Sequence, residues 1–188
     1  MNFEYQNLNI KHLSQLRKFK CANPSMEGFL FEEAYNHHIN GEGITTIVTI
    51  EGSEEIIAYY TLKCDSIKIV DLEMYPEPRY IPCIEIARIA VKTDWQIGKK
   101  GIHLGTELMG LIITQIKENI SSIVGCRFIT LHAVLDRVEW YEERFNFVKR
   151  IDEKALAIDE GTVYMSLDIT DDNVRKEYYE YVISQKSL

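Results

Sequence analysis

A stretch rich in glycine and lysine, "DWQIGKKGIHLGTELM" at 94–109, carries the residue types in this sequence best suited to binding an anion. It joins an apolar, β-branched run at 84–91 to a segment at 105–120 with helical spacing of its apolar residues. The first amides of a helix lack partners within the helix, and glycines let a phosphate approach them closely. The stretch therefore predicts either a phosphate-binding loop or a simple turn. It matches neither the Walker A pattern nor the dinucleotide-binding glycine pattern.

Charge and cysteine content exclude several classes of function. The formal net charge of -8 argues against a general nucleic-acid binder, because Lys and Arg carry affinity for the phosphate backbone. The segment from Arg88 to His103 is a local exception, with Arg88, Lys92, Lys99 and Lys100 against Asp94. The four cysteines form no C-x-x-C pair, so zinc and thioredoxin-like sites lose their usual basis.

The overall pattern predicts one domain, residues 1–188, in the cytoplasm. No apolar run approaches the ~20 residues that a membrane-spanning helix needs, and "MNFEYQNLNI" lacks the features of a signal peptide. Strands are expected at "FEYQNL", on both sides of a turn at "EGSEE", and at "CIEIARIAVK", "CRFITLHAV", "FVKRIDE" and "TVYMSLDI". Helices are expected at about 9–19, 23–41, 105–120, 136–145 and 171–184.

Two segments carry more specific structural expectations. The prolines of "MYPEPRYIPC" predict a surface connection. The last helix is expected to pack an aromatic side with Tyr178, Tyr179 and Tyr181 against the domain, although these residues could instead cover a substrate or a partner subunit.

The order of "IEIARIAV", the glycine stretch, "GTELMGLII", "FITLHAV" and "EWYEERFNFVKR" resembles the GCN5-related N-acetyltransferase (GNAT) family over about 84–169. The resemblance implies an α+β fold with a mixed, mostly antiparallel central sheet flanked by helices, here with an added C-terminal helix. It implies an acetyl-CoA-binding core at about 83–150 and no metal. The expected activity is transfer of an acetyl group from acetyl-CoA to a primary amine of a small molecule or peptide, by direct attack on the thioester.

In this family a loop with the pattern Q/R-x-x-G-x-G/A grips the pyrophosphate of acetyl-CoA. Here Gln96 takes the first position counted from "DWQ", but four extra residues precede "GTELM". Counted back from Gly105, Lys100 takes that position and His103 the first glycine position. Strand residues should orient the pantetheine and thioester, and the donors nearest the helix should face the pyrophosphate. The expected cofactor-binding residues are Ile89, Ala90, Val91, Gln96, Lys100, Gly101, Ile102, His103, Leu104, Gly105 and Thr106.

The resemblance also assigns catalytic roles. Tyr141 matches the tyrosine that family members place beside the coenzyme sulfur, and a phenol with a pKa near ~10 is a protonated donor at neutral pH. Packing in the core is the alternative for this tyrosine. Glu85 is the candidate general base, because a carboxylate in an apolar strand is costly unless it is paired or used. An ion pair with Arg88 or another arginine is the alternative for Glu85.

Two other functions stay open. "FKCANPSMEGFLFEEA" and "IIAYYTLKCDSI" are similar to a GNAT subgroup that includes bacterial toxins acetylating aminoacyl-tRNA. A tRNA partner is possible but disfavoured by the net charge of -8. A non-catalytic module that holds CoA as a sensor or structural element is the other alternative. A homodimer is a further expectation.

Overall fold

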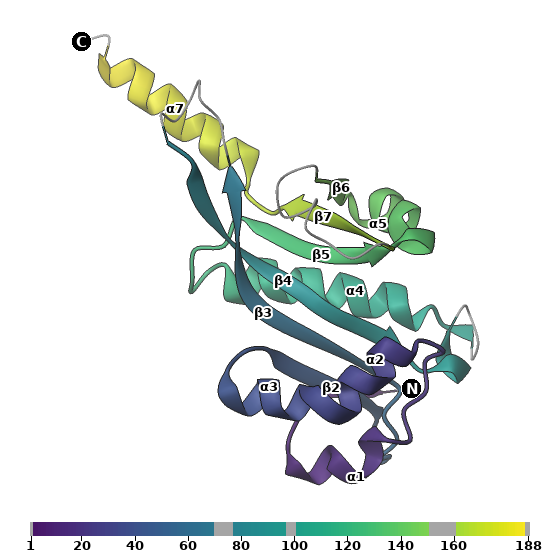
Figure 1. The fold of residues 1–188 in the computed structure, drawn as a ribbon. Coiled ribbons are helices and arrows are strands. Elements are labelled where there is room, and N and C mark those ends of the chain that lie inside the picture. Colours follow the sequence, from purple (N-terminus) through teal and green to yellow (C-terminus); the bar gives the residue numbers. More distant parts are fainter. Residues whose placement is uncertain (1, 70–76, 97–100, 151–160, 187–188) are drawn as a thin grey trace.

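A computed structural model describes residues 2–69, 77–96, 101–150 and 161–186, and its centre is a seven-stranded sheet (Figure 1). The strand order is β1-β2-β3-β4-β5-β7-β6, and neighbours are antiparallel except for the parallel pair β4 and β5. The strands are β1 (Phe3–Asn7), β2 (Ile44–Ile50), β3 (Ala58–Ile69), β4 (Arg79–Val91), β5 (Phe128–Val134), β6 (Val148–Lys149) and β7 (Thr162–Asp168). This is the mixed, mostly antiparallel sheet that the sequence predicts.

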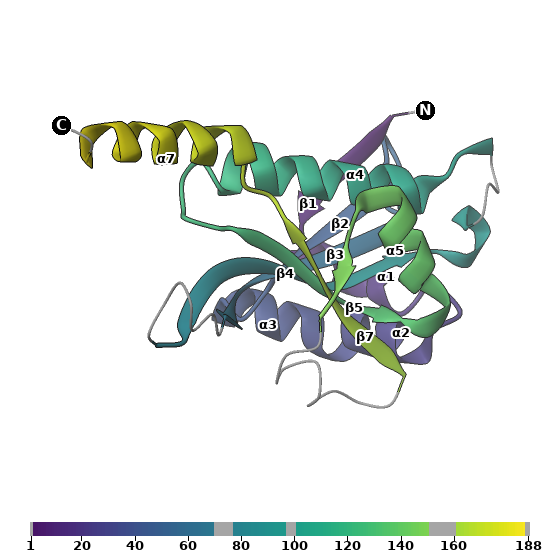
Figure 2. The same ribbon diagram turned by 90° about the horizontal axis from the view of Figure 1, so that it is seen from above.

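Helices cover both faces of the sheet, with α4 and α5 on one side and α1 to α3 on the other (Figure 2). The helices are α1 (Leu13–Leu16), α2 (Pro24–Gly28), α3 (Ala34–Asn40), α4 (Leu104–Gln115) and α5 (Val138–Phe145). A π-helical segment at Phe29–Glu33 joins α2 to α3. The joined helix begins at the N-cap Asn23, whose side chain accepts from the Met26 amide, and ends at Gly41 with a left-handed φ of 71°.

The two faces have separate apolar cores. Leu108, Met109 and Ile112 of α4 are fully buried against the sheet, because their spacing places them on one side of the helix. On the opposite face, Leu30 and Tyr59 form the centre of the second core, and the Tyr59 hydroxyl donates to the Met26 carbonyl at 2.7 Å.

A β-bulge in β4 reverses which side chains face which core. Thr61 pairs with Arg88 but Leu62 pairs with Ile86, so Ala87 has no partner position on β3. Before the bulge, Ile84 and Ile86 pack in the α4 core; after it, the odd-numbered Ile89 and Val91 do so. Arg88 and Ala90 consequently face α2 and α3.

The beginning of β4 corrects one sequence prediction. "MYPEPRYIPC" at 74–83 was predicted as a surface connection, and 74–76 lie outside the described residues. From Arg79 onward the segment is strand and runs through Pro82, which is in register with Ser66. The Pro82 carbonyl accepts from the Arg127 amide at 3.0 Å, on the side of β4 away from β3. Because N–H and C=O of one strand residue point to the same side, the proline removes no hydrogen bond to β3.

The C-terminal part differs from expectation in two ways. Of the strand predicted at 147–153, Val148–Lys149 form β6, and 151–153 lie outside the described residues. Helix α7 (Asp172–Lys186) exists as predicted, and it projects away from the sheet (Figures 1 and 2), but its tyrosines are not packed on the domain as predicted. Tyr178 and Tyr181 are each 62% exposed, because the helix extends beyond the end of the sheet.

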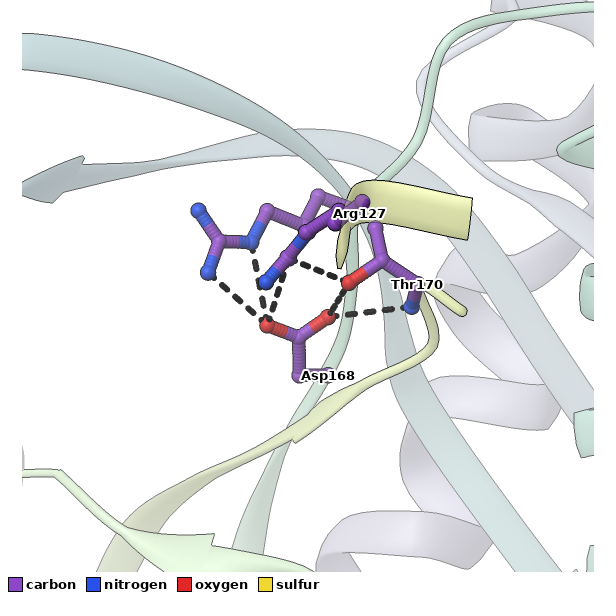
Figure 3. Close-up of polar contacts among 4 residues, drawn as sticks. Arg127, Asp168 and Thr170 are labelled. Atoms are coloured by element: carbon purple, nitrogen blue, oxygen red, sulfur yellow. Dashed lines mark hydrogen bonds and ion pairs between the residues drawn. The ribbon is translucent and has the colours of Figure 1, made fainter. Parts of the chain in front are cut away.

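A polar cluster around Asp168 joins α7 to the sheet (Figure 3). Asp168 Oδ2 accepts from Arg127 Nε at 3.0 Å and from Arg127 Nη2 at 2.9 Å. Arg175 Nη2, from the first turns of α7, lies 3.3 Å from the same oxygen, and the Thr170 amide donates to Oδ1. Burial raises the pKa of this carboxyl, but hydrogen bonds from Thr170 and Arg127 outweigh it and hold the pKa below its usual value.

Replacing Asp168→Asn should loosen α7, because a neutral amide cannot neutralise two guanidinium groups. Hydrogen–deuterium exchange of the α7 amides should accelerate several-fold while the sheet core stays protected. The wild-type carboxylate contributes stability above the ordinary Asp pKa and loses it as the pH falls through its lowered folded value. The α7 amides of the wild type should therefore also exchange faster below about pH 4 than the general pH dependence of exchange explains. Asp136→Asn, at a side chain that is 73% exposed, is the control. Unchanged α7 exchange in Asp168→Asn would contradict this account.

Candidate functional site

Two hollows meet where β4 separates from β5. The two strands pair only over 83–86 of β4 and 128–131 of β5, so β4 separates from β5 from Ala87 onward. The first, here the α4-side hollow, has a volume of about 320 Å³ and is lined by Ile89, Ala90, Val91, Gln96, His103, Gly105, Thr106, Arg137, Trp140 and Tyr141. The second, here the α2-side hollow, has a volume of about 400 Å³ and lies between residues 21–26, the end of β4 and β5. Both are lined by residues 89–91, Gln96, Arg137 and Tyr141, so the two hollows adjoin at these residues.

Most of the predicted cofactor-binding residues line the α4-side hollow. They are Ile89, Ala90, Val91, Gln96, His103, Gly105 and Thr106. Leu104 is only 1% exposed and packs in the α4 core, and Ile102 packs beside that core. Gly101 has a φ of 74°, which favours glycine. Lys100 lies outside the described residues.

The beginning of α4 presents hydrogen-bond donors at the edge of the α4-side hollow. The amides of Thr106 and Glu107 donate to the His103 carbonyl at 2.9 and 3.1 Å. Within the described part of the chain, the amides of Leu104 and Gly105 have no acceptor. A Cβ on Gly105 would meet only Val91 Cγ2, at 3.8 Å, so no side chain closes off this position. The helix end therefore combines two available donors with partial positive charge.

Tyr141 lies at the junction of the two hollows. Helix α5 holds it with its ring edge-to-face against Trp140 and Phe147, at centroid distances of 4.8 and 5.8 Å. The side chain is 8% exposed, and burial raises the pKa of the phenol to about 12, although the nearby Arg137 opposes the shift. The phenol is thus neutral and able to donate a proton at physiological pH.

Glu85 lies apart from this junction, and neither hollow includes it in its lining. It is 5% exposed, and its Oε2 lies 3.2 Å from Lys63 Nζ. Burial raises the pKa of its carboxyl, and Lys63 opposes that rise. The ion-pair partner is a lysine of β3, whereas an arginine was expected. The role of Glu85 as general base stays a prediction.

Gln96 connects the two sides of the site through the backbone. Its Nε2 donates to the Val91 carbonyl at 2.7 Å and to the Cys21 carbonyl at 2.9 Å. The Thr93 amide donates to the Lys20 carbonyl at 2.8 Å, so the segment before α2 is held against the end of β4. Ala22, between these contacts and the N-cap of α2, has a left-handed φ of 62°, which is unfavourable for a residue with a Cβ. The Gln96 side-chain nitrogen is therefore engaged with backbone carbonyls, and the role of Gln96 in cofactor binding stays a prediction.

Several lining residues were missed by the sequence interpretation. Arg137 and Trp140 line the α4-side hollow, and Cys21, Ala22, Asn23, Met26, Arg88, His132 and Asp136 line the α2-side hollow. Arg137 could have been found, because it precedes Tyr141 by one helical turn and shares its face. The motif "FKCANPSMEGFLFEEA" contains 21–26, but it did not place these residues at the site, to which long-range contacts bring them.

The described residues contain no group of three or more His, Cys, Asp or Glu side chains arranged to hold a metal ion. Among the described helices, none combines the length and apolar character needed to cross a bilayer.

Comparison with known proteins shows the fold. No protein-family model matches the chain, and no curated protein matches it in sequence. A solved bacterial toxin is 20% identical, with a TM-score of 0.72 over 89% of this chain and 91% of that one. A tyrosine-to-phenylalanine variant of KacT is 15% identical, with a TM-score of 0.68 over 87% and 94%. AtaT complexed with acetyl-methionyl-tRNAfMet is 17% identical, with a TM-score of 0.67 over 87% and 94%. The chain thus has the GNAT fold that its sequence resembles.

Replacing Gln96→Leu should release the segment before α2 from β4, because both side-chain hydrogen bonds to backbone are lost. Each is worth about 1 kcal/mol, so the free energy of unfolding should fall by roughly 1–3 kcal/mol. Amides at 20–23 should exchange faster with deuterium. Gln115→Leu is the matched control, since this partly buried glutamine accepts a hydrogen bond from Tyr60 elsewhere in the fold. Equal protection of 20–23 in both variants would show that Gln96 does not connect the two sides.

Proposed function

We propose that the chain is an N-acetyltransferase that uses acetyl-CoA as cosubstrate. The observation that carries the proposal is the pair of adjoining hollows, with a neutral, buried phenol among the residues that line both. Such a site lets a donor enter from the α4 side and an acceptor from the α2 side. The two reactants would then be aligned beside one proton donor.

The residues of the α4-side hollow fit acetyl-CoA. The available amides of Leu104 and Gly105, at the positive end of α4, suit the pyrophosphate. Strand residues 89–91, which no longer pair with β5, provide an extended wall for the pantetheine arm. A solved complex of AtaTR with AcCoA has the same fold, at 17% identity and a TM-score of 0.63.

Tyr141 would act as the general acid. As the neutral amine attacks the thioester carbonyl, the new C–N bond forms and the C–S bond breaks, and the phenol donates its proton to the departing sulfur. The proton lost by the attacking nitrogen passes to water, and a proton from water restores the phenol. A pKa of about 12 keeps this proton in place across the working pH range. Ionisation of Tyr141 should consequently cause no loss of turnover below about pH 10.

A finer proposal is that the acceptor is an aminoacyl-tRNA. The specific support is structural likeness to AtaT, which was solved with acetyl-methionyl-tRNAfMet and, in another structure, with the antitoxin AtaR. The net charge of -8 was taken to disfavour tRNA, but charge at the site differs from that of the whole chain. Arg88 and Arg137 line the α2-side hollow, with Asp136 as its one acidic lining residue among those described. Two further proposals accompany the aminoacyl-tRNA acceptor: the chain associates with an antitoxin, and it forms a homodimer.

The first experiment is isothermal titration of the chain with acetyl-CoA. Saturable binding at micromolar concentrations is expected, and absence of binding at high micromolar concentrations would contradict the proposal. CoA release with aminoacyl-tRNA and with a panel of small amines then distinguishes the two acceptor classes. Binding without release for any amine would favour the alternative of a CoA sensor.

Replacing Tyr141→Phe should lower kcat roughly 100-fold, because the ring still packs but the proton donor is gone. The Kd for acetyl-CoA should change less than about twofold. Tyr80→Phe, at a side chain that is 68% exposed and lines neither hollow, is the control. Turnover of Tyr141→Phe equal to that of the wild type would remove the general-acid assignment.

A further inference from the structure

Arg88 is a cation that the backbone of β4 directs into the α2-side hollow. The bulge at Ala87 turns Arg88 away from the α4 core and toward α2. There it lines the hollow together with Asn23, Met26 and Tyr141. A strand without the bulge would leave an arginine pointing into an apolar core, so the bulge determines that this charge faces the site.

The position of the guanidinium group is well defined. Its central carbon lies 4.8 Å from the centroid of the Phe29 ring, and Nη1 donates to the Ala87 carbonyl at 2.7 Å. Stacking and this hydrogen bond hold the planar group in one orientation. The residue is half-buried and lines the α2-side hollow.

No negative charge of the described chain neutralises Arg88. Its Nε is buried and has no hydrogen-bond partner. The nearest carboxylate in sequence, Glu85, pairs with Lys63, and Asp136 of the same hollow lies 3.7 Å from Arg137. A half-buried cation without a counter-ion is costly, and a held guanidinium offers paired donors that suit carboxylate or phosphate oxygens.

We propose that Arg88 binds an anionic oxygen group of the acceptor molecule. This inference rests on the proposed function in assigning the α2-side hollow to the acceptor. The group is a phosphate or a carboxylate carried by the same molecule as the reacting amine. It would belong to the 3′-terminal phosphodiester of an aminoacyl-tRNA or to the carboxylate of a free amino acid.

The test measures binding to the full chain loaded with CoA. The probes that carry an anionic oxygen group, here the anionic probes, are the trinucleotide CCA and free methionine, and the counterparts that lack this group are adenosine and methioninamide. At least one anionic probe should bind more tightly than its counterpart. In Arg88→Ala its Kd should rise about 10- to 100-fold, and Arg88→Lys should recover part of the loss. Binding of CCA points to the tRNA source and binding of methionine to the amino-acid source.

Arg17→Ala is the matched control. The Arg17 guanidinium also stacks on a phenylalanine, 4.2 Å from the Phe31 centroid, but it lines a different hollow. Both variants lose a stacked arginine, so both should show a slightly lower Tm, whereas only Arg88→Ala should lose anion binding. Equal Kd values for the wild type and Arg88→Ala, or no preference for either anionic probe, would overturn the inference.

The outcomes separate this inference from the proposed function. If acetyl transfer is absent but the anionic probe still requires Arg88, the anion site stands and the activity is wrong. If acetyl transfer to the preferred acceptor proceeds with the same KM in Arg88→Ala, the activity stands and the role of Arg88 is wrong.

Discussion

The separation of β4 from β5, together with the bulge at Ala87, is the constraint on which the rest of the site depends. Pairing of these parallel strands ends at Ile86 and Leu131, and the backbone beyond borders both hollows. The bulge lets the end of β4 supply apolar residues to the α4 side and Arg88 to the α2 side. If β4 continued to pair with β5, it would fill the place where the two hollows adjoin and where two reactants can meet.

Local electrostatics then distinguish the site from the acidic surface of the chain. The beginning of α4, which has no side-chain cap, adds partial positive charge at the α4-side hollow. Arg88 and Arg137 add full positive charges at the α2-side hollow. Burial keeps Tyr141 neutral between them. The net charge of -8 is an average over the chain and says little about a site of this size.

The sequence allowed most of the α4 side to be predicted, because its signals are local. The strand 84–91, the glycine stretch and "WYEERFNF" each lie within one element, and they placed 89–91, 103, 105, 106 and Tyr141 at one hollow. The α2 side could not be predicted in the same way. Its residues at 21–26 reach the site through contacts to β4, and Arg88 faces it only because of a register shift between two strands. The exposed position of α7 depends on where the sheet ends, and helical spacing alone predicted burial.

The central claim is that donor and acceptor meet beside Tyr141, where the α4-side and α2-side hollows adjoin. A crystal structure of the chain with acetyl-CoA tests it most directly. The account predicts the pyrophosphate at the first amides of α4 and the thioester sulfur within hydrogen-bond distance of the Tyr141 hydroxyl. Acetyl-CoA bound elsewhere on the chain, or bound here with its sulfur directed away from Tyr141, would contradict it.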